Sequence, residues 1–493
     1  MNGDKVRVQL EPMSVVAEVP RGGALASVLP ELGVEFPCGG TALCGACRVR
    51  VLEGSLSITE PDRSVFSAIE LADGWRLACQ AHAETPLVLE CGQWRMDILA
   101  DDSSLPGAGK RGLGIAIDLG TTTMVAQMVD LATGNVLGVE TALNPQASFG
   151  SDVMSRISAV LQGADLTTVV RLALRQMVTK LTRGREAEIA EVVLVGNTVM
   201  HHLFCGLDVE PLSHAPFHSS HLSAQFFRPQ ELGWPLPDFC RIHFARCLGG
   251  FVGSDILAGI LAAGISRSED INALVDLGTN GEIAIGNRNG IVCASTAAGP
   301  AFEAGSIRMG MRASTGAISR VSLLHNEMCA TVIGGGNAQG ICGSGLVDAV
   351  AAGLESGAIL SSGRIANRSK LFPVKAPVVL YQADIRELQL AKAAIASGFR
   401  ILLKHLSASS GSLKNIYLSG AFGNYVQAES AIAIGLIEAP IERIHASGNT
   451  ALRGAKILLL SSSEPALPKI EHLSLAADPG FQDEFADCIA FPA

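Results

Sequence analysis

Two stretches of the chain share one pattern, LGIAIDLGTTTMVAQMVDLATG at residues 113–134 and NALVDLGTNGEIAIGNRNG at residues 272–290. Each contains an apolar strand, then Asp-Leu-Gly-Thr, then a second strand, and the aspartates Asp118 and Asp276 lie 158 residues apart. The pattern predicts a strand, a tight turn and another strand in both places. Two such hairpins facing one another would form a clamp.

The turn residues suit the binding of nucleotide phosphates. Glycines let backbone N–H groups approach phosphate oxygens, and the neighbouring threonine hydroxyls can donate hydrogen bonds to them. Each aspartate can hold Mg2+ or its water ligands. The predicted nucleotide-contacting residues are Gly120, Thr121, Thr122, Thr123, Gly278, Thr279, Asn280 and Gly281. A single such turn is weak evidence, because turns commonly contain Asp, Gly and Thr, whereas two in matching contexts are strong evidence.

The paired turns resemble the phosphate-1 and phosphate-2 motifs of the acetate kinase, sugar kinase, Hsp70 and actin superfamily. This resemblance implies an α/β fold, a duplicated ribonuclease-H-like ATPase domain around an ATP cleft, with Asp118 and Asp276 in catalytic positions. It also implies a connecting motif at EVVLVGNTVMHHLF, where Asn197 would be catalytic, and an adenosine motif at NIYLSGAFGNYV, where Gly420 and Gly423 would lie beside adenine or ribose. An ordinary strand-to-helix turn is the alternative for each of these two segments.

Four cysteines near the start of the chain predict a metal centre. Cys38, Cys44 and Cys47 are separated by five and then two residues, and Cys79 follows after 31 more. Thiolates bind zinc and iron–sulfur clusters alike, so ligand type alone leaves both open. A structural zinc site usually has two short Cys pairs, whereas here three cysteines share one loop of small residues. Small residues also let backbone N–H groups reach the cluster sulfurs, so the loop favours an iron–sulfur cluster over zinc.

The region around these cysteines has strand character. Residues 5–19 alternate apolar and polar positions on both sides of Pro12, which predicts a two-stranded hairpin. With the cysteine loop, the region resembles the adrenodoxin-like [2Fe-2S] ferredoxins, which implies a β-grasp domain over residues 1–95. Residues 96–112 mix acidic residues with Ser, Pro and Gly, so we expect a linker that holds this domain loosely. The expected ATPase domain, with two subdomains, covers residues 113–493.

Composition narrows the possible partners and location. Of 493 residues, 48% are hydrophobic and 17% charged, which predicts a folded chain of several domains. A formal net charge of -10 argues against nucleic acid as a partner. The start of the chain has no signal-peptide pattern, and no 18-residue stretch is apolar enough to span a membrane. We therefore expect a cytoplasmic protein without a membrane partner.

Three further segments allow structural interpretations. GICGSGLVDAV at 340–350 is a Gly-rich turn into a helix, for which phosphate contact and close packing are equally good explanations. Residues 384–406 predict a long helix with Asp384 as its N-cap. Adjacent His201 and His202 would diverge on a helix, so we expect core or capping roles rather than a shared metal.

Many motifs together, among them GIAIDLGTTT, LNPQASFGSDVMSRI, GGFVGSDILAGI and STAAGPAFEAGSIRMGMRA, resemble the reductive activators of corrinoid-dependent methyltransferases over nearly all of residues 113–493. The resemblance implies that the cluster passes one electron to a Co(II) corrinoid, a cobalamin-type cofactor on a partner protein, restoring Co(I), while the other domain binds and hydrolyses ATP with Mg2+. It implies a corrinoid protein and an upstream electron donor as partners, and a homodimer. Larger family members have a middle domain for which the linker here leaves no room.

Two other functions remain open on the sequence. The chain could donate electrons to another low-potential enzyme, as the activators of radical dehydratases do, although their [4Fe-4S] cluster motif is not evident here. It could instead be a non-catalytic regulator that responds to redox state and nucleotide. Such a regulator would bind ATP without hydrolysing it.

Overall fold

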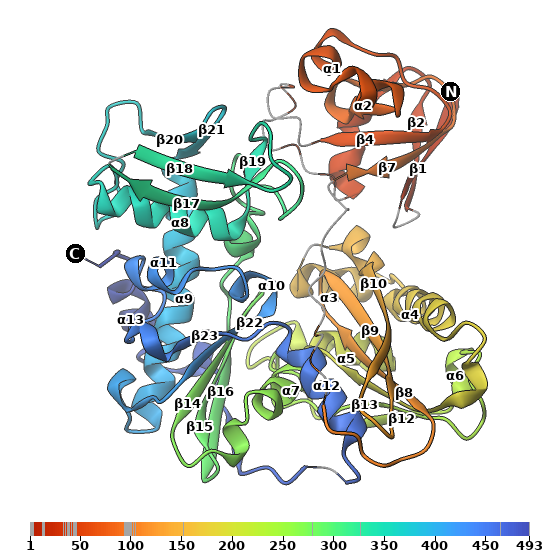
Figure 1. Ribbon diagram of the computed structural model, residues 1–493, viewed down its shortest axis with the longest axis vertical. Helices are drawn as coiled ribbons and strands as arrows, with labels where there is room; N and C mark the ends of the chain where they lie inside the picture. The colour runs from red at the N-terminus through yellow and green to blue at the C-terminus, as the bar shows by residue number, and fades with distance from the viewer. Residues whose placement is uncertain are drawn as a thin grey trace. The chain divides into compact units, whose positions relative to one another are not determined.

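The computed structural model divides the chain into two compact units, residues 1–97, 300–391 and 490–493, and residues 98–299 and 392–489 (Figure 1). It describes all residues except 1–3, 12–14, 33, 35, 37–39, 41, 43–46, 93–100, 102, 104, 151, 279, 326, 464 and 493, and the side chains of 30, 31 and 421. The domain boundaries expected at residues 95 and 112 stay predictions. Among the described residues, no helix is both long and apolar enough to cross a membrane.

The first unit begins with a five-stranded mixed sheet of order β2-β1-β7-β4-β5. Its strands are β1 (Lys5–Glu11), β2 (Val15–Pro20), β4 (Arg48–Glu53), β5 (Trp75–Leu77) and β7 (Leu87–Cys91). Strands β1 and β2 pair antiparallel, which confirms the predicted hairpin, while its turn lies outside the described residues. Val6, Val8 and Leu10 alternate into the core, as the sequence pattern predicts for a sheet with one solvated face.

Short elements complete this sheet. Two helices, α1 (Glu60–Val65) and α2 (Ala68–Ala72), each begin with a capping box, in which the N-cap side chain and the third helical residue bond each other's backbone N–H. The short strands β3 (Gly23–Ala24) and β6 (His82–Ala83) pair antiparallel. The cysteine loop expected to hold a cluster leads into β4, and Cys79 follows β5.

The remainder of the first unit is a small α/β region. It contains β17 (Ala317–Leu324), β18 (Glu327–Val332), β19 (Gly340–Ile341), α8 (Gly343–Glu355), β20 (Leu371–Lys375), β21 (Val378–Tyr381) and the start of α9 (Gln382–His405). A Cβ added to Gly345 would lie 2.2 Å from the carbonyl oxygen of Ile318. Close packing therefore explains the glycines at the start of α8.

The predicted long helix exists, but its start differs from the prediction. Helix α9 begins at Gln382, two residues before the expected N-cap. The Asp384 carboxylate instead accepts hydrogen bonds from the backbone N–H groups of Tyr381, at 2.7 Å, and Arg308, at 2.9 Å. Asp384 thus satisfies the helix start from within the first turn.

The second unit contains two six-stranded sheets, of order β10-β9-β8-β11-β13-β12 and β23-β22-β14-β15-β16-β24. The first sheet comprises β8 (Leu113–Leu119), β9 (Thr123–Asp130), β10 (Val136–Leu143), β11 (Ile189–Val195), β12 (Gln225–Phe227) and β13 (Arg241–Phe244). The second comprises β14 (Asn272–Leu277), β15 (Gly281–Asn287), β16 (Gly290–Thr296), β22 (Ile416–Ser419), β23 (Ile444–Ala446) and β24 (Ile470–His472).

These two sheets repeat one topology. In β10-β9-β8-β11-β13 the first three strands are antiparallel and the last two run parallel to β8, and β16-β15-β14-β22-β23 follows the same order and orientations. The duplication predicted from the two Asp-Leu-Gly-Thr stretches is therefore confirmed. Strands β8 and β14 occupy equivalent central positions, so Asp118 and Asp276 end equivalent strands.

The second unit also contains most of α9, from Lys392 onward. Its other α-helices are α3 (Val153–Leu161), α4 (Leu166–Thr182), α5 (Thr198–Cys205), α6 (Pro229–Leu232), α7 (Ser254–Ala262), α10 (Gly420–Gly423), α11 (Ala428–Ala433), α12 (Thr450–Leu460) and α13 (Phe481–Asp487). Helices α7 and α12 lie between the two sheets (Figure 1), with α12 against β8, β9 and β11 and α7 against β14, β15 and β16.

Helices α7 and α12 cross in very close contact. A Cβ added to Gly454 of α12 would lie 2.0 Å from the carbonyl oxygen of Ala258 in α7. Only glycine lets the two backbones approach this closely. The two halves of the duplicated fold therefore meet through a tightly fitted helix pair.

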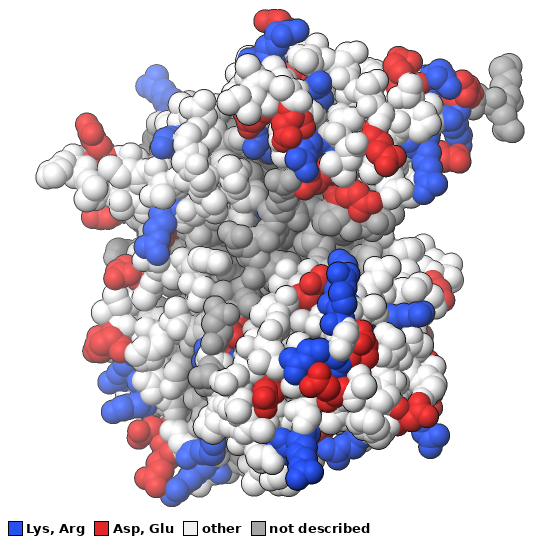
Figure 2. All heavy atoms as spheres, turned by 45° about the vertical axis from the view of Figure 1, so that its right-hand side comes forward, with Lys and Arg blue, Asp and Glu red and all other residues white. Residues whose placement is uncertain are grey.

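The described part of the linker packs against this second unit. Leu105 and Ala108 contact the apolar cluster around α12, and Asp101 is buried. The described linker residues are therefore held on the second unit, which composition does not show, while a loose tether for the first domain stays a prediction. On the face drawn in Figure 2, basic and acidic side chains are interspersed.

Candidate functional site

The two described cluster cysteines lie at neighbouring backbone positions. Cys47 immediately precedes β4, and its carbonyl oxygen accepts a hydrogen bond of 2.9 Å from the N–H of Ala78, next to Cys79. Gly40, at φ +80°, would place a Cβ 3.8 Å from the Cβ of Cys79. The Gln80 side chain donates to the Gly40 carbonyl oxygen at 3.0 Å.

Gly40 therefore lies beside Cys79, and Cys47 beside the neighbouring Ala78. Cys38 and Cys44 lie outside the described residues, so the geometry of the four-cysteine set is a prediction. The described residues fit a cluster, because a left-handed glycine and a side-chain amide bring the loop backbone next to a thiol.

The first phosphate turn joins β8 to β9. Asp118 pairs in register with Val125, and the N–H of Gly120 donates to the Thr123 carbonyl oxygen at 3.0 Å. A Cβ on Gly120 would come within 2.6 Å of that oxygen, so the turn requires glycine. Thr122 accepts a backbone hydrogen bond from Asn144 through its carbonyl oxygen.

The connecting segment meets this turn, as expected. Asn197 is the N-cap of α5, where its side-chain oxygen accepts the N–H of Met200 at 3.0 Å. Its side-chain nitrogen donates to the Thr121 hydroxyl at 2.9 Å. Asn197 thus holds the first phosphate turn, and its contact is with Thr121 rather than with Asp118.

The second phosphate turn joins β14 to β15. Asp276 pairs in register with Glu282, and the N–H of Gly278 donates to the Asn280 carbonyl oxygen at 3.1 Å. The Ser419 hydroxyl donates to Oδ2 of Asp276 at 2.7 Å. Thr279 lies outside the described residues, and Gly281 begins β15, where a Cβ would meet Ile395 at 2.6 Å.

The glycines of the expected adenosine motif pack against the second turn. Gly420, at φ +83°, would place a Cβ 2.6 Å from Oδ1 of Asp276. A Cβ on Gly423 would lie 3.2 Å from the backbone of Leu418. The structure thus brings Gly420 to the Asp276 carboxylate, and contact of either glycine with a nucleoside stays a prediction.

Two acidic residues that the sequence interpretation missed join the same site. Asp255 lies in the first turn of α7, and Glu282 lies in β15 opposite Asp276. The turn before Asp255 packs against the connecting segment, since a Cβ on Gly253 would lie 2.2 Å from the Gly196 carbonyl oxygen. Glu282 lies within the second Asp-Leu-Gly-Thr stretch, and Asp255 lies within GGFVGSDILAGI, one of the segments that carry the family resemblance, but the sequence interpretation assigned a role to neither.

Burial perturbs all four carboxyl groups, and neighbouring charges add to the shift at Asp118, Asp255 and Glu282. Burial raises the pKa of Asp118 to about 6, while the hydrogen bond from Asn449 opposes this shift and the charge of Asp276 adds to it. Burial raises the pKa of Asp255 to about 8, and the charges of Asp276 and Asp118 contribute. Burial also raises the pKa of Asp276, against the hydrogen bond from Ser419.

Glu282 follows the same trend. Burial raises the pKa of Glu282 well above its usual range, and the charges of Asp255 and Asp276 raise it further. Such a cluster attracts a cation, which would favour the ionised carboxylates. Within the described part of the chain, no three Asp, Glu, His or Cys side chains are placed to ligate one metal.

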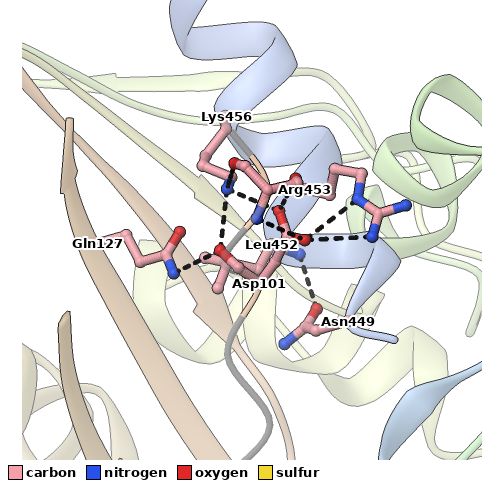
Figure 3. A network of polar contacts seen from close by, with 7 residues as sticks. Asp101, Gln127, Asn449, Leu452, Arg453 and Lys456 are labelled. Atoms are coloured by element: carbon pink, nitrogen blue, oxygen red, sulfur yellow. Dashed lines mark hydrogen bonds and ion pairs between the residues drawn. The ribbon is translucent and has the colours of Figure 1, made fainter. Parts of the chain in front are cut away.

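One further contact reaches Asp118 from α12. Asn449, the N-cap of α12, donates from its side-chain nitrogen to Oδ2 of Asp118 at 2.9 Å. One and two turns along the same helix, Arg453 and Lys456 bind the carboxylate of Asp101 (Figure 3). No local pattern in the sequence indicates this connection.

Comparison with known proteins gives matches along most of the chain. A family model described as "2Fe-2S iron-sulfur cluster binding domain" matches residues 8–84, one described as "RACo middle region" matches 113–268, and one described as "C-terminal domain of RACo the ASKHA domain" matches 270–493. The chain therefore has an iron–sulfur cluster binding domain and an ATP-binding domain of the ASKHA type. The expectation that a middle domain is missing is wrong, because the residues after the short linker match the family's middle region.

Individual relatives agree with these matches. The corrinoid activation enzyme RamQ of Eubacterium limosum is 34% identical over 414 residues, which cover 76% of this chain and 69% of that protein. A [Co(II) methylated amine-specific corrinoid protein] reductase of Methanosarcina barkeri is 28% identical over 71% of this chain and 70% of its own. A solved structure of a reductive activator for corrinoid,iron-sulfur protein covers 99% of this chain and 98% of its own, at 27% identity and a TM-score of 0.67. The chain belongs to the RACo family of reductive activators of corrinoid proteins.

Proposed function

We propose that this chain is an ATP-hydrolysing enzyme that reduces the Co(II) corrinoid of a partner protein to Co(I), and so repairs a corrinoid-dependent methyltransferase system. The observation that carries the proposal is the convergence of Asp118 and Asp276, which end equivalent strands of the repeated sheets and repel each other. The names of the two relatives, a corrinoid activation enzyme and a Co(II) corrinoid protein reductase, support the substrate.

The acidic residues would bind the nucleotide. Asp118 and Asp276 would hold Mg2+, directly or through water, while the amides and hydroxyls of the two turns bind the phosphates. Asp255 enters the cluster from the start of α7 and, once ionised, would accept a proton from the attacking water. Asn197 would keep Thr121 in place for the phosphates.

The cysteines would hold the electron carrier. Cys38, Cys44, Cys47 and Cys79 are the proposed ligands of a [2Fe-2S] cluster. When bound, the cluster supplies one electron at a low potential, about -400 mV in plant-type ferredoxins. Each additional gap of about 59 mV makes a one-electron transfer tenfold less favourable, or about 1.4 kcal/mol. Because Co(I) corrinoids have very low potentials, the ATP-binding domain would supply the energy that makes the transfer productive.

An anaerobic assay tests the proposal. The purified protein is reduced and mixed with a Co(II) corrinoid protein and ATP·Mg2+, and Co(I) absorbance is followed. We expect Co(I) to form faster with ATP than without, and Asp118→Asn and Asp276→Asn to lose this stimulation while they retain the cluster spectrum. Equal rates with and without ATP would refute ATP coupling. Nucleotide binding without hydrolysis would indicate a regulator instead.

The partners complete the proposal. An upstream electron donor would reduce the cluster between turnovers, and a homodimer would be the active assembly by analogy with the family. Analytical ultracentrifugation with and without ATP·Mg2+ tests the second point, since a monomer in both conditions would exclude the dimer.

A further inference from the structure

The N-terminal end of α12 (Thr450–Leu460) touches the nucleotide site. The side-chain nitrogen of Asn449 donates to Oδ2 of Asp118 at 2.9 Å, and its side-chain oxygen accepts the N–H of Leu452 at 2.8 Å. One side chain therefore both caps the helix and binds a carboxylate of the site. A change in the orientation of Asp118 therefore alters a hydrogen bond of the residue that caps the first turn of the helix.

Further along α12, two basic residues bind the linker. Arg453 and Lys456 follow Asn449 by four and seven residues, so all three lie on one face of the helix. Arg453 contacts Oδ1 of Asp101 at 3.1 and 3.2 Å, and Lys456 contacts Oδ2 at 2.6 Å (Figure 3). Lys456 is 0% exposed and Asp101 is 5% exposed, so this ion pair is removed from water.

Backbone contacts strengthen the attachment. Lys456 also donates to the carbonyl oxygens of Asp101, at 3.0 Å, and Ser103, at 2.8 Å. Gln127 of β9 donates to the same Asp101 carbonyl oxygen at 2.8 Å. At the far end of α12, Lys110 donates to the carbonyl oxygens of Leu459 and Ser461. The linker is thus bound to α12 near its middle and at its C-terminal end.

Helix α12 has little freedom to absorb a displacement at its start. Gly454 packs its backbone against Ala258 of α7, the helix whose first turn carries Asp255. A close-packed helix moves as a rigid body rather than deforming gradually. The same body therefore connects two acidic residues of the nucleotide site to the segment that leads to the iron–sulfur domain.

We propose that Asn449 is a positioning residue for Asp118 and that α12 couples nucleotide binding to the linker of the iron–sulfur domain through the Asp101 ion pairs. The inference rests on the proposed function, because it takes ATP·Mg2+ as the ligand of Asp118. A cation on Asp118 competes with Asn449 for the carboxylate, so the bound and unbound states differ in this contact. Such differential contact is what a ligand needs to shift a conformational equilibrium, and the linker in turn affects nucleotide affinity.

Asn449→Ser separates the two roles of the side chain. Serine is as good an N-cap as asparagine but is too short to reach Asp118, so the helix keeps its cap and loses the contact. Amide hydrogen exchange is measured on residues 101–112 and 449–460 of the full chain, with and without ATP·Mg2+. In the native protein, ATP·Mg2+ should change the exchange of both segments. In Asn449→Ser, the change in residues 101–112 should fall at least about fivefold, the lower end of typical coupling.

A second variant removes the ion pair between α12 and the linker. Asp101→Asn combined with Lys456→Met removes both buried charges, which avoids leaving one of them unpaired. We expect ATP hydrolysis to stay within about twofold of native, while ATP stimulation of Co(I) formation falls at least about fivefold. Arg185→Gln, which breaks an exposed pair with Glu188 in the same unit, is the control and should retain full stimulation.

The outcomes distinguish this inference from the proposed function. If the native protein neither binds nor hydrolyses ATP, the proposed function fails. If it hydrolyses ATP but the exchange of residues 101–112 does not respond to nucleotide, only the coupling through α12 is refuted. Full ATP stimulation in the Asp101→Asn, Lys456→Met variant would refute it equally.

Discussion

Binding of ATP·Mg2+ is expected to release protons from the acidic cluster. Without a cation, the pKa of Asp118 is raised to about 6 and that of Asp255 to about 8, in each case chiefly by burial. A divalent cation favours the ionised form of both groups, so they must lose their protons when it binds. Nucleotide affinity should therefore rise as the pH rises from about 6 to about 8.

The size of the effect follows from these values. At about pH 7, a group with a pKa of about 6 is protonated in roughly one tenth of molecules, and a group with a pKa of about 8 in roughly nine tenths. Together they release about one proton per nucleotide bound. At about pH 9 the sum falls to roughly one tenth of a proton, so these two groups no longer make the affinity depend strongly on pH. The pKa values of Asp276 and Glu282 are also raised, and each adds to the release where the cation ionises it too.

Isothermal titration calorimetry measures this number directly. ATP·Mg2+ is titrated at one pH in two buffers of different ionisation enthalpy, and the difference in apparent enthalpy gives the protons released. Asp255→Asn should lower the release at about pH 7 by roughly nine tenths of a proton while the cluster spectrum stays unchanged. A native protein that releases no protons at about pH 7, or a variant that releases as many as the native protein, would refute the acidic cluster as the cation site.

Three further predictions concern stability and the second turn. Lys456→Ala should lower the free energy of unfolding by about 3–5 kcal/mol, because it leaves Asp101 buried without its main partner. Urea titrations measure this loss, and a loss below about 1 kcal/mol would contradict a buried ion pair. Burial acts to raise the pKa of Asp101, but hydrogen bonds from Lys456 and Ser103 and the charges of Lys456 and Arg453 lower it overall. The contribution of Asp101 to stability is therefore present above about pH 4, and it is lost as the pH falls through the folded pKa. Acid unfolding of the native protein should accordingly be steeper below about pH 4 than that of Asp101→Asn, and parallel curves would count against the assignment. Gly420→Ala should weaken ATP binding, because the added Cβ would lie 2.6 Å from Oδ1 of Asp276 and the backbone at this position is left-handed. Calorimetry measures the affinity, and an unchanged value would show that this contact does not matter for the nucleotide.

The sequence predicts those parts of the site that depend on local pattern. Strands β8 and β14 are mostly apolar runs with Asp118 and Asp276 one residue before their ends, and Asp-Leu-Gly-Thr marks a tight turn after each, so the hairpins and their duplication follow from the residues alone. Asn197 follows from the same logic, since it caps a helix directly after a strand. These features involve residues within a few positions of one another.

The remaining site residues depend on contacts between distant segments. Asp255 and Glu282 have no local signature, because one lies in an ordinary first helical turn and the other at a strand position whose neighbours are apolar. Arg453 and Asp101 are 352 residues apart, and Asn449 and Asp118 are 331 apart. Composition predicts a linker at residues 96–112, but it cannot show that a buried Lys456 binds Asp101 within that segment.

The acidic cluster and α12 together suggest how ATP could influence an electron transfer that takes place elsewhere in the chain. Burial disfavours the ionised form of these four carboxyl groups, and a bound cation offsets that cost. Part of the binding free energy is therefore available to change the contacts of Asp118, and Asn449 is one of those contacts. A ligand shifts a conformational equilibrium only through contacts that differ between the two states of the protein. A site with fully solvated carboxylates would therefore bind ATP without changing the contacts of Asp118 in this way. The linker must also have a defined bound state. The Lys456–Asp101 ion pair, which is removed from water, provides that state, and a change in the contacts of Asp118 can alter its population.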